Sequence, residues 1–454
     1  MLKSFMNHML SSKNISVFKQ ITYIFLCLYV LDVITLGTND ILSVVGVSTR
    51  MIFWGISILT SIPVLAKEYK SFLKNKAFLM TLVFVVFVGI SVVVGVLNGN
   101  YIPILIGDVK GFLHILIVIP MMCVLGDKEK LEKLLKLVLN VVVISCIISV
   151  FLSYMEMYPY AIKDFLYRVV NGTGIGLLTG ITEYVSRCFL YSGTRMAAWG
   201  LLLAFAFLVI EKKKFVLRYI QMSCCLVGAF VSYARAVYLG MAIAVILFLV
   251  VIALRYREYL LQTVKKYVGV LLLTTVLISV IGITQHSNLF VVAIDRCIIA
   301  VKGDALLEGD EAGEPEVEIG NLEAEVDSLV VREIRQQMAI ENFLKSPIVG
   351  GGLGVVNDPD NNTIEYFYLD LLSKMGLVGL IIFLLPAIIC FVCILKKKEL
   401  FSEKQKLLSL ASWFGLLYLM IISYFNPCMN TSWGLMVYGM VITISTPWAI
   451  ESNR

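Results

Sequence analysis

The chain consists of apolar runs long enough to cross a lipid bilayer, separated by short basic breaks. A transmembrane helix needs about 20 mainly apolar residues. Apolar residues make up 59% of the chain and charged residues 15%, against roughly 45–50% and about 25% in soluble domains. This excludes a soluble fold, and with it a nucleic-acid-binding module, although the net charge is +6. We therefore predict an all-α polytopic integral membrane protein with about 12 transmembrane helices.

The expected spans follow one another along the chain and predict its organisation. Nine of them fall within residues 1–284, an extracytoplasmic loop covers 285–374, and three more fall within 375–454. The first run follows a mixed stretch without the small-residue cleavage site of a signal peptide, so we expect no cleaved leader. The twelve runs lie near 18–37, 41–66, 77–97, 101–126, 137–156, 190–210, 215–233, 236–254, 267–284, 375–395, 406–425 and 430–449.

Basic residues gather in every second break, which predicts the orientation. Positively charged loops stay on the cytoplasmic side of a membrane. Both termini are then cytoplasmic, and the loops over 157–189 and 285–374 are external. The basic breaks, which hold more than half of the 38 Lys and Arg residues, are 67–76, 127–136, 211–218, 255–266 and 396–406.

The segment over 303–327 is rich in Asp and Glu and contains neither Lys nor Arg. Like charge with few aromatic residues is typical of a mobile, solvated linker. Capture of a cation or a basic sugar is the alternative interpretation.

The cysteines and histidines do not indicate a metal site. No His or Cys spacing typical of a zinc site occurs, so we expect neither metal nor cofactor. Most of the ten Cys residues fall in expected spans, where a free Cys packs as a small apolar residue; Cys188, Cys297 and Cys428 are the candidates to face outward. His114 is interpreted as a satisfied core residue, and His286 as a weak candidate for an external base.

Four basic residues lie in the external halves of expected spans, where charge is costly and usually functional. Arg50 and Lys110 lie inside their spans, and Arg195 and Arg235 lie at external span ends. Together they predict an outward-facing site for an anion such as phosphate, which guanidinium binds through two parallel hydrogen bonds. The alternatives are structural.

Those structural alternatives differ from residue to residue. Arg195 and Arg235 are placed to reach lipid headgroups by snorkelling. Arg50 has two candidate ion-pair partners, Asp32 and Asp108.

The last third of the chain carries the most specific pattern. Apolar spacing over 333–344 predicts an external helix that ends before Pro347. A glycine-rich turn over 350–354 follows, but it lacks the Lys-Ser/Thr of a phosphate-binding P-loop. We expect a second helix from about 362, on which Glu365, Tyr368, Leu369 and Leu372 share one face.

In this order and spacing the chain resembles the O-antigen ligase/polymerase superfamily over about 190–385. The resemblance includes the upstream Ser232 and Arg235 in the sequence SYARAVYLG, and the span count with its large external loop. It implies a GT-C-like fold. The other matching residues are Arg332, Ser346-Pro347-Ile348, Gly350, Gly352, Gly354, Tyr368-Leu369 and Gly376-Leu377-Val378-Gly379-Leu380.

One departure from the family pattern concerns the expected reaction. The ligases of this superfamily place a His where this chain has Glu365. This favours a Wzy-type polymerase that joins repeat units of O-antigen or capsular polysaccharide.

The resemblance also implies how that reaction proceeds. A glycan leaves an undecaprenyl-diphosphate donor on the outer face of the plasma membrane, without metal and with inversion. Arg195, Arg235, Arg332 and Lys110 would bind the diphosphate, Tyr368 the glycan, and Glu365 would take the acceptor proton.

Other functions remain open at this point. A ligase with the same fold and a lipid-linked oligosaccharide flippase are the main alternatives. Related six-span halves, which transporters usually show, are not evident here. The expected partners are the bilayer, a lipid-linked glycan donor and acceptor, and, from the resemblance, a chain-length regulator; we expect no nucleic acid.

Overall fold

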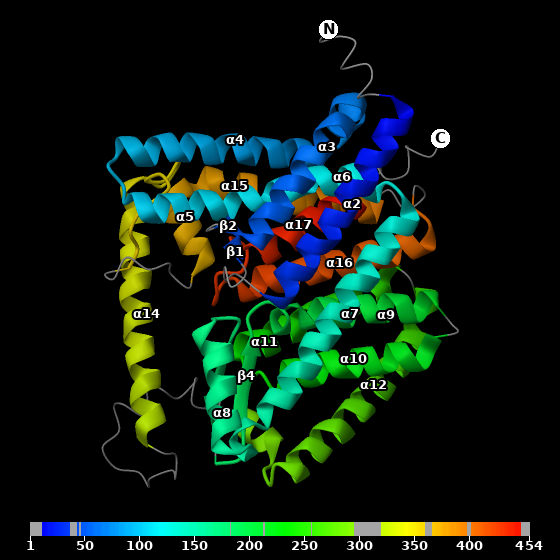
Figure 1. Ribbon diagram of the computed structural model, residues 1–454, viewed down its shortest axis with the longest axis vertical. Coiled ribbons are helices and arrows are strands. Elements are labelled where there is room, and N and C mark those ends of the chain that lie inside the picture. The colour runs from blue at the N-terminus through cyan, green and yellow to red at the C-terminus, as the bar shows by residue number, and fades with distance from the viewer. Residues whose placement is uncertain are drawn as a thin grey trace.

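The computed structural model describes residues 11–36, 43–44, 47–181, 183–211, 214–255, 257–294, 319–358, 366–396 and 401–445. Cys297, Glu365 and residues 303–318 of the acidic segment lie outside these ranges. The described chain is mainly helical, which confirms an all-α polytopic membrane fold (Figure 1).

Each expected span corresponds to a helix or to a broken helix in the same order. Nine of those described are long and apolar enough to cross a membrane. They are α2 (Ser12–Thr35), α3 (Thr49–Lys74), α4 (Lys76–Leu97), the run α5 (Ile102–Leu113), η1 (His114–Ile117) and α6 (Val118–Leu125), α7 (Lys128–Ser153), α11 (Arg235–Arg255), α12 (Arg257–Thr284), α15 (Phe367–Lys396) and α16 (Glu403–Ile422).

The other three expected spans form shorter apolar helices: α9 (Ala197–Ile210) after the 3₁₀ turn η4 (Thr194–Met196), α10 (Phe215–Phe230) and α17 (Ser432–Ile444). Every residue of α17 is buried, as expected of a helix that is apolar all round. Its 13 residues rise about 20 Å, less than the roughly 30 Å hydrocarbon core. The length of α17 therefore suits a helix enclosed by protein.

The polar breaks both end one helix and cap the next. Asn75 accepts hydrogen bonds from the amides of Ala77 and Phe78 at the start of α4. Asp127 does the same at the start of α7, and Ser402 forms a capping box with Gln405 at the start of α16. An N-cap side chain satisfies amides that the first helical turn leaves unpaired. The same residues that interrupt hydrophobicity thus fix where each helix begins.

Close helix packing forms one large hydrophobic core, with two smaller clusters beside it. In Figure 1 helices α4, α5, α9 and α10 run across the view, whereas α2, α3, α7 and α12 run obliquely. Helix α9 packs on both α10 and α16. Gly415 allows the second of these approaches, because a Cβ there would lie 2.3 Å from the Trp199 ring. On the other side of the bundle, α15 packs along α4. The ring of Phe383 on α15 stacks on the ring of Tyr438 on α17, with the ring centroids 5.4 Å apart.

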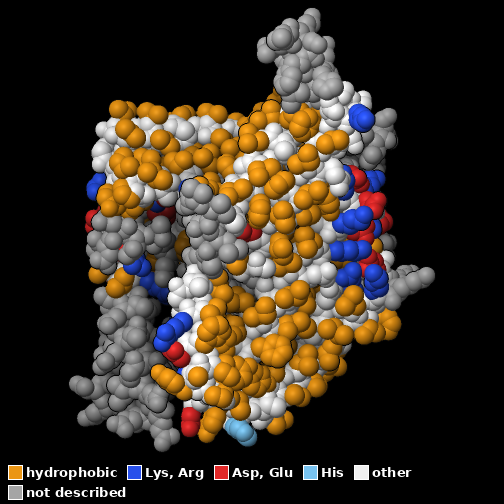
Figure 2. Space-filling view, viewed as in Figure 1, with side chains coloured by type: hydrophobic (Ala, Val, Ile, Leu, Met, Phe, Trp, Pro, Cys, Tyr) orange, Lys and Arg blue, Asp and Glu red, His pale blue; other side chains and the backbone are white. Residues whose placement is uncertain are grey.

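The basic breaks form one end of the bundle, at the right of Figure 2, where Lys, Arg, Asp and Glu side chains gather. Lys136 lies 2.7 Å from Glu132 and 2.6 Å from Glu211, and Arg218 lies 2.6 Å from Glu211. These ion pairs tie α7 to the connection between α9 and α10. Hydrophobic side chains cover much of the visible flank of the bundle. We call this the basic end, and the other the hairpin end.

At the hairpin end the structure contains strands that the sequence did not predict. After α8 (Tyr160–Tyr167), strands β3 (Gly176–Gly180) and β4 (Ser186–Leu190) form an antiparallel hairpin, with Leu178 opposite Cys188. A second, two-residue pair joins β1 (Ser43–Val44) to β2 (Val47–Ser48). Gly176 and Gly180 weakened the strand pattern in the sequence, because glycine is depleted in strands.

The helix expected over 333–344 is confirmed as part of a longer one. Helix α14 (Ile319–Lys345) stands across the other helices at the left of Figure 1. It begins inside the segment that we interpreted as a mobile linker, so residues 319–327 are helical, while the mobility of the segment stays a prediction. Pro347 lies just beyond the helix end, as predicted.

Helix α15 begins before the expected span and contains a kink. Gly376 has φ 63° and ψ −169° within it, a conformation open to glycine because it has no Cβ. The kink separates a short first segment, which carries polar residues, from the apolar run expected over 375–395. It coincides with the boundary expected between the loop and the last three spans.

Candidate functional site

Aromatic rings surround the Arg195 guanidinium at the hairpin end. Its carbon lies 4.8 Å from the centre of the Phe189 ring, 5.4 Å from Tyr191 and 5.8 Å from Trp433. Cation–π contacts at such distances hold a guanidinium without neutralising it. The local fold explains this position, because β4 and the residue after it supply two rings directly before η4, on which Arg195 lies.

The loop between α16 and α17, residues 423–431, provides the polar contacts of Arg195. One terminal nitrogen lies 3.4 Å from the Asn426 Oδ1, and the other lies 4.0 Å from the Cys428 Sγ. Burial raises the pKa of the Cys428 thiol, and Arg195 only partly offsets this effect. The thiol is therefore protonated at neutral pH, so Arg195 is not consumed by an ion pair with a thiolate.

A second arginine, Arg187 on β4, approaches the same Phe189 ring at 5.9 Å. Its Nε donates a hydrogen bond of 3.1 Å to the Ser232 carbonyl. Ser232 precedes a turn in which Tyr233 has φ 47°, and the first residue of α11 after that turn is Arg235. The Ser-x-x-Arg element thus packs on the strand that leads to Arg195. We define Arg187, Arg195 and Arg235 as the arginine cluster.

Arg195 and Arg235 stand out in the sequence by their place at expected span ends, whereas Arg187 does not. The signal was present, since Arg187 lies two residues before an aromatic residue in an expected external segment. This spacing does not by itself predict a site residue, because the sequence does not indicate the β3–β4 hairpin that sets the direction of the Arg187 side chain.

Arg50 is buried in the core instead of facing an open cavity. Its Nη1 donates to the Ser432 Oγ at 3.2 Å, at the first residue of α17. Tyr29 lies beside it and bridges the Ser432 carbonyl and the His114 Nδ1, each at 3.3 Å. The expectation that His114 is a satisfied core residue is confirmed. Asp108, one of the two expected partners of Arg50, is paired elsewhere.

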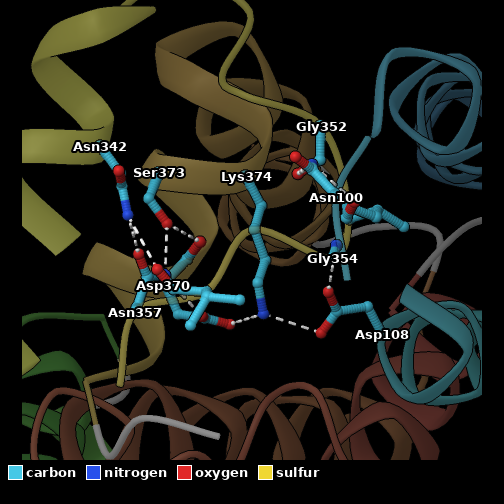
Figure 3. A network of polar contacts seen from close by, with 11 residues as sticks. Asn100, Asp108, Asn342, Gly352, Gly354, Asn357, Asp370, Ser373 and Lys374 are labelled. Carbon is cyan, nitrogen blue, oxygen red and sulfur yellow. Dashed lines mark hydrogen bonds and ion pairs between the residues drawn. The ribbon is translucent and has the colours of Figure 1, made fainter. Parts of the chain in front are cut away.

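That pairing forms a buried ion triad between α5 and α15 (Figure 3). The Lys374 Nζ lies 2.8 Å from an oxygen of Asp108 and 2.8 Å from an oxygen of Asp370. The Asp108 side chain also accepts a hydrogen bond of 2.9 Å from the Gly354 amide. All three charged side chains are at least nine-tenths buried. Buried charges persist only when they are paired and hydrogen-bonded. The triad therefore fixes α5 to α15.

The glycine-rich segment 350–354 is fixed by the ion triad, through Asp108, and by two asparagines. The Asn98 amide donates to the Gly351 carbonyl at 3.0 Å, and the Asn100 amide donates to the carbonyls of Gly351, Gly352 and Leu353. In turn the amides of Gly351 and Gly352 donate to the carbonyls at the end of the first α15 segment. The backbone groups of this segment are therefore engaged with protein, so it is a structural clamp between α4 and α15.

Polar contacts continue from the clamp to α14. The Asn357 amide donates to Asp370 at 3.0 Å and to Ser373 at 2.7 Å, while Asn342 of α14 donates to Asn357 (Figure 3). Arg335, one turn after the expected site residue Arg332, lies 3.1 Å from the buried Asp358. Arg332 is half-buried on the same helix. The chain up to Asp358 is thus anchored to α14 and α15.

The remaining expected site residues lie on or next to α15 and α5. The Tyr368 hydroxyl donates to the Met420 carbonyl at 2.7 Å, and its ring packs beside Phe367 against the core. Helix α15 begins at Phe367, later than the helix expected from about 362. Glu365 itself lies outside the described residues. Lys110 is exposed and lines a cavity beside α5.

Fold and site together define an all-α membrane protein whose arginine cluster lies at the end of the bundle opposite its basic breaks. Residues 220–384 match the family model described as O-antigen ligase. The match confirms the resemblance to the O-antigen ligase/polymerase superfamily, and it includes Arg235, α14, the clamp and the first half of α15. No curated protein matches the chain.

Proposed function

We propose that this protein is a polysaccharide polymerase, an inverting glycosyltransferase that joins lipid-linked repeat units at the hairpin end. The observation that carries the proposal is the arginine cluster, in which Arg195 is held by aromatic rings next to the element that bears Arg235. Such a cluster suits a diphosphate, because each guanidinium offers a planar fork to phosphate oxygens. The superfamily match supports the same chemical class.

Positive charge at this point serves the departure of the leaving group. The acceptor hydroxyl oxygen bonds to the anomeric carbon of the donor, and the bond from that carbon to the diphosphate oxygen breaks. The electron pair leaves with the diphosphate, whose growing charge Arg195 and Arg235 stabilise, with Arg332 at the edge of the site. Fixed positive groups aimed at developing charge are a major source of catalysis.

Glu365 is the proposed base that takes the acceptor proton. The contacts of the two residues that follow it support this role. Phe367 donates its amide to the Ser423 carbonyl at 3.2 Å, and the Tyr366 ring lies 6.2 Å from the Tyr424 ring. Both contacts are with the 423–431 loop, whose Asn426 bonds to Arg195. The chain next to Glu365 thus approaches the loop that holds the arginine cluster.

The experiment that tests this function compares glycan ladders on gels. Cells deleted for the gene are complemented with wild type, Glu365→Gln, or the control Glu341→Gln, which alters an exposed residue of α14. We expect the deletion and Glu365→Gln to stop at one lipid-linked repeat unit, and the control to restore the ladder. Expression of each variant is verified by blot. Normal chain length in Glu365→Gln would remove it as the base.

Two other outcomes would replace the proposed function. The matching family model is described as O-antigen ligase, and a ligase would leave long polymer detached from its final acceptor. Repeat units trapped on the cytoplasmic face would indicate a flippase. We further propose that the basic end faces the cytoplasm of a bacterial cell, so that the arginine cluster works on the outer face, where a chain-length regulator is an expected partner.

A further inference from the structure

A cavity of about 520 Å³ opens between α3, α4 and α5, outside the arginine cluster. Its walls are almost entirely apolar and include Met51 and Trp54 of α3 and Val92 of α4. Ile106 and Lys110 line it from α5, and both are exposed. Ligand sites are typically cavities of roughly 300–1,000 Å³ with apolar walls and a few polar groups.

The wall beside Lys110 is fixed in place. His114 lines the cavity, its Nδ1 lies 3.3 Å from the Tyr29 hydroxyl, and its ring meets the Trp54 ring edge-on at 5.7 Å. The cavity is therefore a rigid apolar slot, and the Lys110 side chain that lines it ends in an ammonium group that adds almost nothing to the lining surface. This combination fits an amphiphile with a hydrocarbon chain and an anionic head, because the chain replaces water on the walls and the ammonium binds phosphate as a point charge.

Helix α5, which carries Lys110, and Arg195 of the arginine cluster contact different parts of one loop. Gly111, next to Lys110, packs so closely on this loop that a Cβ there would lie 2.7 Å from the Asn430 carbonyl oxygen. Arg195 contacts Asn426 and Cys428 of the same loop. Residues 423–431 thus connect two cationic positions that approach from different helices.

We propose that this cavity binds the polyprenyl chain of the acceptor lipid, with its diphosphate at Lys110. This inference rests on the proposed function, because joining two lipid-linked glycans requires places for two chains and two diphosphates. The two diphosphates differ in chemistry. That of the donor leaves and gains charge, which suits several guanidiniums, whereas that of the acceptor stays attached and unchanged, which suits one ammonium.

The test measures KM separately for donor and acceptor with purified protein and lipid-linked substrates. Ile106→Trp fills the mouth of the cavity, and Ile102→Trp, one turn earlier on α5, is the matched control, because Ile102 is also exposed but lies away from the lining. We expect Ile106→Trp and Lys110→Ala to raise the acceptor KM about tenfold or more, with the donor KM unchanged.

A second acceptor with a short prenyl tail separates cavity filling from general damage. It cannot occupy the slot, so Ile106→Trp should leave its KM unchanged, whereas Lys110→Ala should still raise it. A changed donor KM, or an unchanged acceptor KM in both variants of an active enzyme, would overturn the second site. Wild-type protein without any polymerase activity would instead overturn the proposed function.

Native mass spectrometry distinguishes a substrate lipid from an ordinary bilayer lipid. Purified protein is offered undecaprenyl phosphate and phosphatidylglycerol in equal amounts. Preferential retention of the prenyl lipid, lost in Ile106→Trp and kept in Ile102→Trp, supports the proposal. Equal retention of both lipids, with both lost in Ile106→Trp, would make the cavity a bilayer-lipid site and overturn it.

Discussion

At the scale of single residues, the environment of Arg195 explains why an arginine is needed there. Three aromatic rings lie within 6 Å of its guanidinium carbon. A delocalised, weakly hydrated guanidinium packs on rings more readily than an ammonium does, and it can still offer two parallel donors to phosphate. The same side chain can therefore be held by the protein and remain available to an anion.

This environment predicts the effect of a substitution that keeps the charge. Arg195→Lys removes the planar fork, and we expect polymer formation to fall at least about tenfold, which corresponds to roughly 1.4 kcal/mol of transition-state stabilisation. The measurement is the initial rate of lipid-linked glycan extension. Arg168→Lys is the control, because that side chain is 79% exposed at the same end of the molecule. Full activity of Arg195→Lys would contradict diphosphate binding by this residue.

Sequence reasoning identified Arg195 because it stands at a span end, but it did not reveal the role of Lys374. In the sequence Lys374 stands just before an apolar run, and this position does not indicate a buried partner. Its partner Asp108 is 266 positions away in sequence, so only the packing of α5 against the 350–354 segment brings the two charges together. Asp370, four residues before Lys374, was a local sign of an ion pair.

The triad predicts a strong asymmetry between substitutions. Lys374→Met leaves Asp108 and Asp370 buried without a cation, and breaking a buried pair in this way costs about 3–5 kcal/mol. We expect a large fall in the melting temperature of the detergent-solubilised protein, with low yield. Asp108→Asn retains Asp370 as a partner for Lys374, so its loss should be smaller. Equal stability of Lys374→Met and wild type would show that the triad does not hold α5 to α15.

At the scale of elements, the glycine-rich segment differs most from its interpretation in the sequence. Spacing alone indicated a flexible turn, since glycine permits many conformations. In the structure Gly350, Gly352 and Gly354 have φ of 76°, 88° and 83°, and their surroundings fix them. The sequence could not predict this rigidity, because the fixing groups Asn98 and Asn100 come from the end of a helix about 250 residues earlier.

A methyl group at Gly352 should disrupt this clamp. A Cβ there would lie 2.2 Å from the Gly95 amide nitrogen, and φ of 88° is strained for alanine. Left-handed strain of about 1–2 kcal/mol and overpacking of about 1–3 kcal/mol predict a substantial loss of stability for Gly352→Ala. Thermal unfolding in detergent measures it.

Gly89→Ala provides the matched control for this substitution. It places a methyl group on α4 where no atom lies within 4 Å. That variant should be as stable as wild type or more stable by up to about 1 kcal/mol, because alanine favours a helix. Equal melting temperatures for the two variants would contradict a clamped loop.

At the scale of the whole molecule, the charge pattern predicted helix order and the two ends, but not the layering. The alternation of basic breaks with apolar runs is local and can be read directly. Which helices are enclosed depends on their neighbours: α17 is as apolar as an expected span, and only its burial by surrounding helices explains its short length. The candidate site was predicted only in part for the same reason, since Arg187 and Asp108 acquire their roles through tertiary contacts.

The basic end makes stability depend on pH through Glu211. Burial raises the pKa of this carboxyl, but hydrogen bonds from Lys136 and Arg218 more than offset this, so its pKa lies below the ordinary value. The stabilisation is therefore present above the unfolded-state pKa of about 4.3 and is lost as the pH falls through the folded-state value. Glu211→Gln should lower stability by about 1 kcal/mol at pH 7, with a smaller difference below pH 4. Melting curves across this range test the prediction.

An exposed ion pair on α7, also at the basic end, gives the control. Glu129 and Lys133 have side chains 75% and 63% exposed, and exposed pairs contribute roughly 0–1 kcal/mol. Glu129→Gln should therefore match wild type at both pH values. A pH-independent loss in Glu211→Gln would mean that its packing, and not its charge, stabilises the contact between α7 and α10.

Orientation in the membrane follows from the same asymmetry and can be measured directly. Tyr160 on α8 is 83% exposed at the hairpin end, and Lys133 is exposed at the basic end. If the positive-inside rule holds, an impermeant maleimide should label Tyr160→Cys in intact spheroplasts, and Lys133→Cys only after permeabilisation. The background should be low, because the native cysteines among the described residues are buried or half-buried. The reverse labelling pattern would place the arginine cluster on the cytoplasmic side, where an acceptor arriving from the outer leaflet could not reach it.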